Sequence, residues 1–155
     1  MKHVLVISDL HVGSKFGLSV TAGNEIQNTL GGLWLDMVDN LKAGPKLDAI
    51  FMGGDMVDGT NYKAGGKGLD SSDMMEQILE AQELIDLIPD APTFAVGGST
   101  YHVGNNFNAD EVLAKMIGAA YGEELFAQIG NVRAHIAHKV EIGRASCRER
   151  VCQYV

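Results

Sequence analysis

Carboxylate and imidazole side chains follow three short apolar segments of this 155-residue chain. The segments and the residues after them read VLVISDLHVG (4–13), AIFMGGDMVDG (49–59) and TFAVGGSTYHVG (93–104). Each delivers side chains that bind cations, namely Asp9 and His11, Asp55, and His102. A carboxylate combined with an imidazole suits Mn²⁺, Fe or Zn²⁺ better than Ca²⁺. The sequence therefore predicts a transition-metal site built from the three segment ends.

The spacing within the first segment predicts how two of these ligands act together. Asp9 and His11 are two residues apart, and in an extended segment such side chains point the same way. We therefore expect both to bind one cation. Glycines beside the polar residues, such as Gly54 and Gly98, allow tight backbone turns without Cβ strain.

Alternating strands and helices are predicted to position these side chains. Val4–Ile7 is continuously apolar, which suits a parallel strand covered on both faces. Apolar spacing predicts further strands at 49–52, 93–96 and 132–140, and helices at 25–42, 70–88 and 110–120. The second helix has Asp70, Ser71 or Ser72 as its expected N-cap. The pattern predicts an α/β fold, in which ligands gather beyond the carboxyl ends of the strands.

Composition narrows the classes of function. The chain has 12 basic and 20 acidic residues, a net charge of −8, so no broad basic face is expected to hold nucleic acid nonspecifically. A phosphorylated substrate would then need a local positive charge, for which a metal ion is the obvious candidate. No apolar run is long enough to span a membrane, and the N-terminal run is too short for a signal peptide. We therefore expect a cytoplasmic protein without membrane contact.

The last residues differ in character from the rest. Residues 141–152 read EIGRASCRERVC, with neither strand alternation nor a helical apolar stripe. This string resembles the conceptual translation of a sequencing adapter. We therefore expect one domain over 1–140 and a foreign tail over 141–155, with the C-terminal part of the domain missing. On this interpretation Cys147 and Cys152 carry no information about redox compartment or metal binding.

Over residues 3–140 the chain resembles the calcineurin-like metallophosphoesterases. D-x-H of that family matches Asp9–His11, and G-D-x-x-D matches Gly54–Asp58. In place of G-N-H the chain has GSTYHVG at 98–104, similar to the G-T-P-Y-H-V-G of phage-type members, and the closing G-H-x-H is absent. The resemblance implies a metallophosphoesterase sheet with flanking helices, here a partial sandwich.

The resemblance also implies a role for each matching residue. Asp55 would bridge two metal ions, and Asp9 with His11 would complete much of the shell of one. Asp58 would orient a ligand by hydrogen bonding from outside the metal shell. His138 would be the lone downstream ligand of the second ion.

The departure from G-N-H leaves two roles open. Ser99 or Thr100 replaces the missing asparagine ligand, and Ser99 is taken as the metal ligand. His102 would protonate the leaving oxygen or stabilise charge on the phosphoryl group. Alternatively, His102 itself coordinates a metal ion.

The implied function is metal-dependent hydrolysis of phosphodiesters or phosphomonoesters, with nucleotides or nucleic acid as suitable substrates. Two divalent ions (Mn, Fe, Zn or Ni, with Mn favoured) would polarise the phosphoryl group and lower the pKa of a shared water. One alternative is an inactive fragment that binds a single ion without turnover. Another is a receiver-like domain with a phosphoacceptor aspartate, disfavoured because His11 has no role there and no lysine follows at a late strand end. The oligomeric state is left open.

Overall fold

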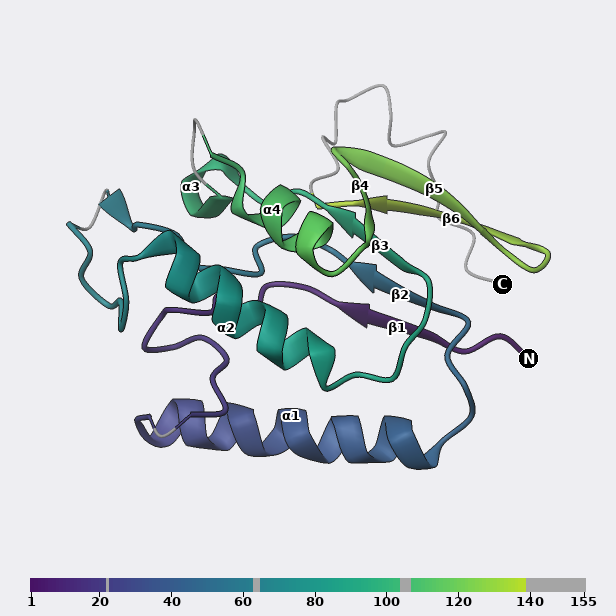
Figure 1. Cartoon of the computed structure of the whole chain (residues 1–155), viewed down its shortest axis with the longest axis horizontal. Helices are drawn as coiled ribbons and strands as arrows, with labels where there is room; N and C mark the ends of the chain where they lie inside the picture. The colour runs from purple at the N-terminus through teal and green to yellow at the C-terminus, as the bar shows by residue number, and fades with distance from the viewer. Residues whose placement is uncertain (22, 63–64, 104–106, 139–155) are drawn as a thin grey trace, which may run out of the picture.

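The structure is a computed structural model that describes residues 1–21, 23–62, 65–103 and 107–138. Its centre is a parallel four-stranded sheet with the strand order β1-β2-β3-β4 (Figure 1). The strands are β1 (Val4–Ile7), β2 (Ala49–Met52), β3 (Thr93–Val96) and β4 (Ala120–Gly122). The predicted α/β class is confirmed. The tail expected at 141–155 lies outside the described residues.

Helices flank the sheet and connect its strands. They are α1 (Glu25–Ala43), α2 (Met74–Asp86), the short α3 (Thr100–Val103) and α4 (Ala109–Met116). Asn24 begins α1 with a capping box that includes Gln27, and Gly44 ends it, so the prediction of 25–42 is one residue short. No helix in the described part of the chain is both long enough and apolar enough to cross a membrane.

Strand β2 is buried along its whole length because its two faces pack against different layers. Alternate residues of a strand point to opposite sides. Ile50 and Met52 join the larger core, which helices α1, α2 and α4 complete. Ala49 and Phe51 join a smaller core on the opposite side of the sheet.

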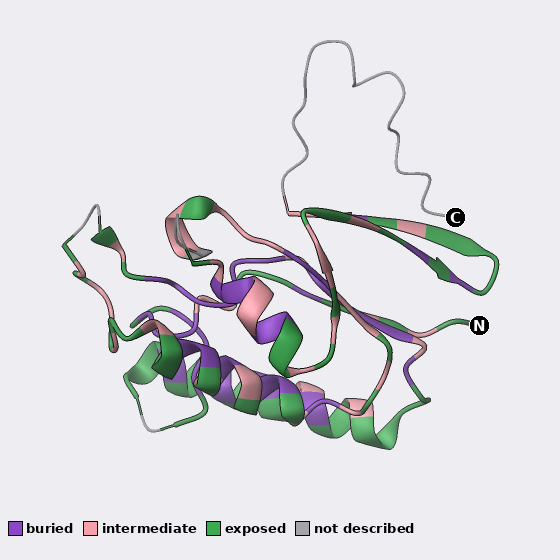
Figure 2. Ribbon diagram, turned by 45° about the horizontal axis from the view of Figure 1, so that its top comes forward, coloured by how far each residue is buried: buried purple, intermediate pink, exposed green. Residues whose placement is uncertain are grey.

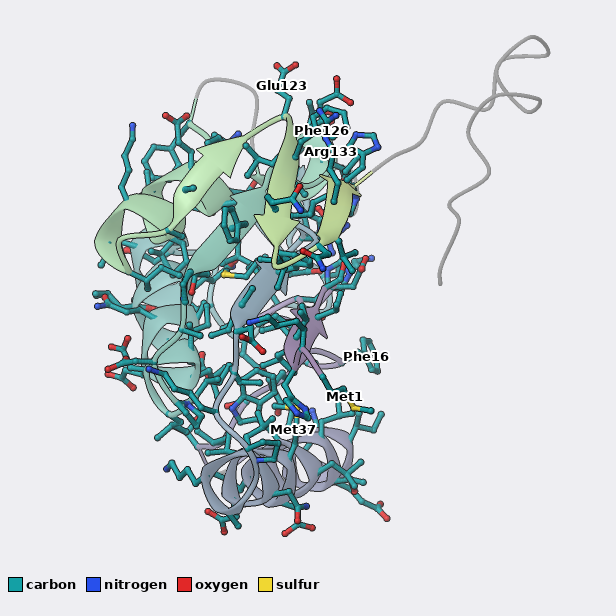
Figure 3. All side chains as sticks on the ribbon, turned by 90° about the vertical axis from the view of Figure 1, so that its right-hand side faces the viewer. Met1, Phe16, Met37, Glu123, Phe126 and Arg133 are labelled. Atoms are coloured by element: carbon teal, nitrogen blue, oxygen red, sulfur yellow. The ribbon has the colours of Figure 1, made fainter. Side chains whose placement is uncertain are left out.

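The smaller core is closed by an antiparallel hairpin of β5 (Glu124–Ile129) and β6 (Val132–Ala137). Ala127, Ile129 and Ile136 of this hairpin pack with Phe51 and Val96 of the parallel sheet. Figure 3 views the layers from the side, with α2 and the hairpin on opposite sides of the sheet. Much of the hairpin and the outer surface of α1 are exposed (Figure 2).

The expectation that β1 is covered on both faces is wrong. It is an edge strand of the sheet, and Val4 and Val6 are 37% and 67% exposed. The hairpin residues that cover this face of the sheet pack against β2 and β3 instead. A continuously apolar run therefore predicts a strand, but it does not show whether that strand is central or at the edge of the sheet.

Two element boundaries also differ from the prediction. Helix α2 begins at Met74, and Asp73 caps it by accepting hydrogen bonds from the backbone of Met75 and Glu76. Two of the three residues predicted as caps bond to other side chains. Asp70 accepts a hydrogen bond from Gln27, and Ser71 donates one to Glu76. Periodicity alone does not separate four adjacent polar residues, each of which is a favourable cap.

The region after α4 is less helical than expected. The predicted helix over 110–120 ends at Met116, and residues 120–122 form β4 beside β3. Gly118 has a φ of +70°, a left-handed conformation that ends helices and that glycine adopts without strain. Strand β5 was not predicted, and β6 ends at Ala137, short of the expected residue 140.

We expect Asp73→Ala to lower the free energy of unfolding by about 1 kcal/mol, because two backbone N–H groups at the start of α2 lose their acceptor. Chemical denaturation monitored by circular dichroism measures the change. Ser72→Ala is the matched control and should leave stability nearly unchanged. Equal losses in both variants would contradict the assignment of Asp73 as the cap.

Candidate metal centre

The loops after β1, β2 and β3 meet at the carboxyl edge of the parallel sheet. The first two run side by side, held by backbone hydrogen bonds from Asp9 N to Gly54 O (3.0 Å) and from His11 N to Asp55 O (3.2 Å). The pairing continues with Val12 N to Met56 O at 3.0 Å. The predicted ligands of these two loops are therefore kept in register by the backbone.

The backbone of this edge is left-handed at three candidate ligands. Asp9, His11 and Asp55 have φ values of 56°, 48° and 52°, and among the described non-glycine residues Asn61 is the other with positive φ. The extended geometry expected for Asp9 and His11 is therefore wrong. Such conformations cost on the order of 1–3 kcal/mol each and cluster at functional sites.

The candidate ligands form two groups that share one carboxylate. One group is His11, Asp55 and His102, and the other is Asp9, Asp55 and His138. Within each group, one possible ligand atom from every residue lies within 4.8 Å of the others. Asp9 and His11 thus belong to different groups, although the nearest carboxylate oxygen of Asp9 is 3.9 Å from His11 Nε2. Asp55, 5% exposed, lies at the junction.

His138 reaches the site from the residue after β6. Its Nδ1 donates a hydrogen bond to the Gly53 carbonyl oxygen at 2.7 Å, because a carbonyl oxygen only accepts. In the neutral ring this leaves a lone pair on Nε2, which lies 3.2 Å from Asp55 Oδ2. Two electron-rich atoms at this separation are favourable neighbours only with a cation or a proton between them. A metal-bound histidine has this same arrangement, with its other nitrogen bonded to a carbonyl.

Asp58 connects the two histidines of the other group. Its Oδ1 lies 3.2 Å from His11 Nδ1 and 3.4 Å from His102 Nδ1. His102 Nδ1 also donates to the Asp58 carbonyl oxygen at 2.8 Å, which leaves Nε2 as the ring nitrogen that could bind a metal ion. The Asp58 side chain is 12% exposed. This position beside both rings fits the orienting role predicted for Asp58.

Ser99 lies directly against the shared carboxylate. Its backbone N–H donates to Asp55 Oδ1 at 2.7 Å, and its hydroxyl lies 3.3 and 3.4 Å from the two Asp55 oxygens. The preceding residue must be glycine, since a Cβ on Gly98 would lie 2.1 Å from Asp55 Oδ1. Ser99 was predicted as a metal ligand, and in the structure it contacts Asp55 as a hydrogen-bond donor.

Asp110, which the sequence analysis missed, holds the loops together from below. It is 2% exposed and accepts hydrogen bonds from the backbone N–H groups of Asp55 (3.0 Å), Met56 (3.2 Å) and Gly98 (2.8 Å). Burial raises the pKa of its carboxyl to about 6, against the opposing effect of these three donors, and the nearby charge of Asp55 adds to the rise. In the sequence it reads as an ordinary acidic residue in the first turn of a helix.

The residues present fit a divalent transition metal. Imidazole nitrogens and carboxylate oxygens are the appropriate donors. The buried Nδ1 of His11 has no hydrogen-bond partner among the described residues, because Asp58 Oδ1 is close but not aligned with it. A buried polar atom without a partner is energetically costly. A bound ion or the other tautomer of the ring would change this cost.

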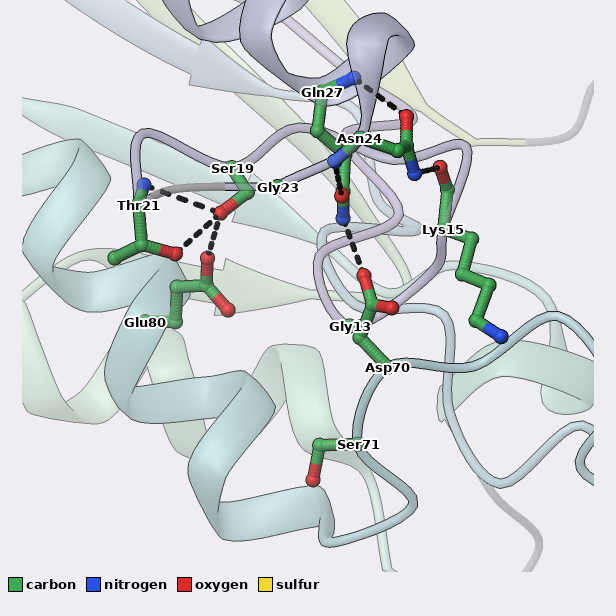
Figure 4. Close-up of a pocket in the computed structure, with 10 residues that line it drawn as sticks. All are labelled: Gly13, Lys15, Ser19, Thr21, Gly23, Asn24, Gln27, Asp70, Ser71 and Glu80. Carbon is green, nitrogen blue, oxygen red and sulfur yellow. Dashed lines mark hydrogen bonds between the residues drawn. The ribbon is translucent and has the colours of Figure 1, made fainter.

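A separate polar pocket is not connected to this chemistry. It has a volume of about 290 Å³ and contains none of the candidate ligands (Figure 4). Its polar groups already bond to one another, with Ser19 donating to Glu80 at 2.6 Å and Gln27 donating to Asp70. We therefore assign it no part in the site.

No model of a known protein family matches this sequence, and no curated protein matches it. The distances, burial and hydrogen bonds given above therefore carry the functional interpretation.

We expect the carboxyl carbon of Asp110 to titrate with a midpoint near pH 6 in the metal-free protein, measured by NMR. Because the folded state holds this proton more tightly than the unfolded state, its contribution to stability is complete below about pH 4 and is lost as the pH rises through about 6. The rise of the Asp110 pKa from 3.8 to about 6 corresponds to about 3 kcal/mol. Asp48, whose pKa a hydrogen bond from Lys2 lowers, is the internal control. A midpoint for Asp110 at or below 4 would contradict the burial argument.

Proposed function

We propose that the chain is a metal-dependent phosphoesterase with a binuclear centre, of the calcineurin-like type. The observation that carries the proposal is the shared position of Asp55, which belongs to both three-residue groups. A carboxylate with two oxygens can join two ions, and paired ions about 3.5–4 Å apart are typical of phosphoryl hydrolysis. The parallel sheet, its helices and the hairpin on the opposite face would then be part of a metallophosphoesterase sandwich.

The proposed ligands divide between two ions. Asp9 and His138 would hold one ion, His11 and His102 the other, and Asp55 both. When bound, such ions polarise the phosphoryl oxygens and lower the pKa of a coordinated water, which supplies the nucleophile at neutral pH. Mn²⁺ is our first choice, with Fe, Zn²⁺ and Ni²⁺ as alternatives that the same donors accept.

The protein's own groups orient this centre. Gly53 O holds the ring of His138, and the carbonyl oxygen of Asp58 holds that of His102. Ser99 N–H and the Asp110 carboxylate hold the side chain and the backbone of Asp55. Partners of this kind fix ring orientation and commonly change metal affinity or activity 10- to 100-fold when removed.

The charge balance supports a role for cations. The two groups together contain two carboxylates, and Asp58 adds a third beside His11. A phosphoester anion would be repelled by these charges alone. Two divalent ions reverse the sign of the local potential and so make the same residues a phosphate-binding site.

The distances favour a ligand role for His102 over a proton-donor role. His102 belongs to the group with His11 and Asp55, and its ring meets that of His11 edge to face at a centroid distance of 4.4 Å. Contact this close is expected of two ligands of one ion. The proton-donor role predicts a different response to mutation, which the second experiment below measures.

We expect Asp55→Asn to abolish binding of the second Mn²⁺ and to weaken the first, because the shared negative charge is lost. Isothermal titration gives stoichiometry and affinity, and Mn²⁺-dependent hydrolysis of bis(p-nitrophenyl) phosphate should fall by a factor on the order of 100 or more. Asp39→Asn, on the exposed face of α1, is the matched control. Wild-type binding of a single ion without turnover would support the inactive-fragment alternative instead.

We expect His102→Ala to lose one of two Mn²⁺ equivalents, whereas His135→Ala, on the hairpin surface, keeps both. Unchanged stoichiometry would return His102 to the role of acid. In that case esters with poor leaving groups should slow far more than p-nitrophenyl esters, because p-nitrophenolate needs little protonation.

A further inference from the structure

An apolar pocket opens beside the candidate metal centre and shares Asp9 and His11 with it. Its volume is about 300 Å³, at the lower end of the range for small-ligand sites. The other walls come from the loop after β1 and from helix α1, and include Leu10, Phe16, Leu30, Leu33, Trp34 and Met37. The pocket thus adjoins two of the proposed metal ligands.

The pocket has a buried floor and an exposed apolar rim. Trp34 is 6% exposed, whereas Phe16 and Leu33 are 68% and 61% exposed. The ring of Phe16 stands clear of the ribbon in Figure 3. A ligand that covers an exposed apolar side chain lowers the free energy of the complex, in proportion to the apolar area removed from water. Contiguous exposed apolar surface next to a polar site is typical of a ligand groove.

The charges around the pocket restrict its occupant. Its described lining contains no lysine or arginine, and Asp9 contributes a negative charge. A second phosphate would have no cationic partner there, so the part of the substrate in the pocket carries no negative charge. The indole of Trp34 and the ring of Phe16 supply flat surfaces, against which aromatic rings pack favourably.

We propose that this pocket binds an uncharged aromatic group that is esterified to the phosphoryl group of the substrate. The proposal rests on the proposed function, because the metal centre must hold the phosphoryl group at Asp9 and His11. It adds a preference for aryl over small alkyl esters. Leu33 and Phe16 are then residues that determine specificity.

The test compares phenylphosphonate with methylphosphonate, which share an anionic head and are not hydrolysed. Both are titrated by NMR into protein loaded with Zn²⁺, a diamagnetic ion. The chain has one tryptophan, so its indole N–H signal reports on Trp34 alone. We expect phenylphosphonate to bind about tenfold more tightly. The indole signal should shift with phenylphosphonate and stay in place with methylphosphonate.

The variants assign the preference to the pocket. Leu33→Asn and Phe16→Ala should each reduce the phenyl preference at least threefold, and both positions are exposed enough for the fold to persist. Leu35→Asn is the matched control, since Leu35 is an exposed residue of the same helix that does not line the pocket. It should keep the wild-type preference.

The other outcomes are distinct. Equal affinity for the two phosphonates, or a preference that survives both variants, overturns the pocket assignment and leaves the proposed function standing. Failure of both phosphonates to bind contradicts the proposed function and this proposal with it. A concentration-dependent dimer in sedimentation that Leu33→Asn abolishes would assign the pocket to a second copy of the chain, which also overturns the proposal.

Discussion

The buried carboxylate of Asp110 joins the loops that follow β2 and β3. Its two oxygens accept hydrogen bonds from the backbone N–H groups of Asp55, Met56 and Gly98. These residues follow the strands, so their N–H groups do not pair within the sheet. An apolar residue there would leave three backbone donors without this partner, and the two buried ones would each cost about 1–3 kcal/mol. Asp110 therefore holds the backbone of Asp55, the residue that both candidate groups share. The raised pKa of Asp110 reflects the unfavourable burial of the charged carboxylate that accepts these three bonds.

The rest of the edge combines local strain with rigid support. Left-handed backbone at Asp9, His11 and Asp55 is unfavourable in isolation, yet hydrogen bonds between the first two loops hold these residues in it. Val12 and Val57, both fully buried, anchor the loops to the main core just beyond the candidate ligands. The core therefore stabilises a crowded arrangement of carboxylates and imidazoles that unsupported loops would not maintain.

Much of the fold follows from local rules. The boundaries of β2 and β3 agree with the prediction because short apolar runs bounded by glycine or proline carry a strong signal. The order of strands and the exposed face of β1 do not follow from local rules, since they depend on where the hairpin packs. The hairpin itself was only half predicted. Its β5 strand has weak alternation, and its pairing with β6 is a contact between separate segments.

For the candidate site, the sequence by itself determined which residue types stand at the strand ends, and parallel strands bring such ends to one edge. This is why Asp55 and His102 could be named without coordinates, whereas His138 was named only through the family resemblance. Only the tertiary structure decided how they divide, because left-handed turns separate Asp9 from His11 and place them in different groups. Nor could spacing reveal Asp110, whose partners are backbone groups that look alike at every position. Side-chain identity is written in the sequence, whereas the direction of each side chain and the partner of each backbone N–H are set by packing between segments far apart in the chain.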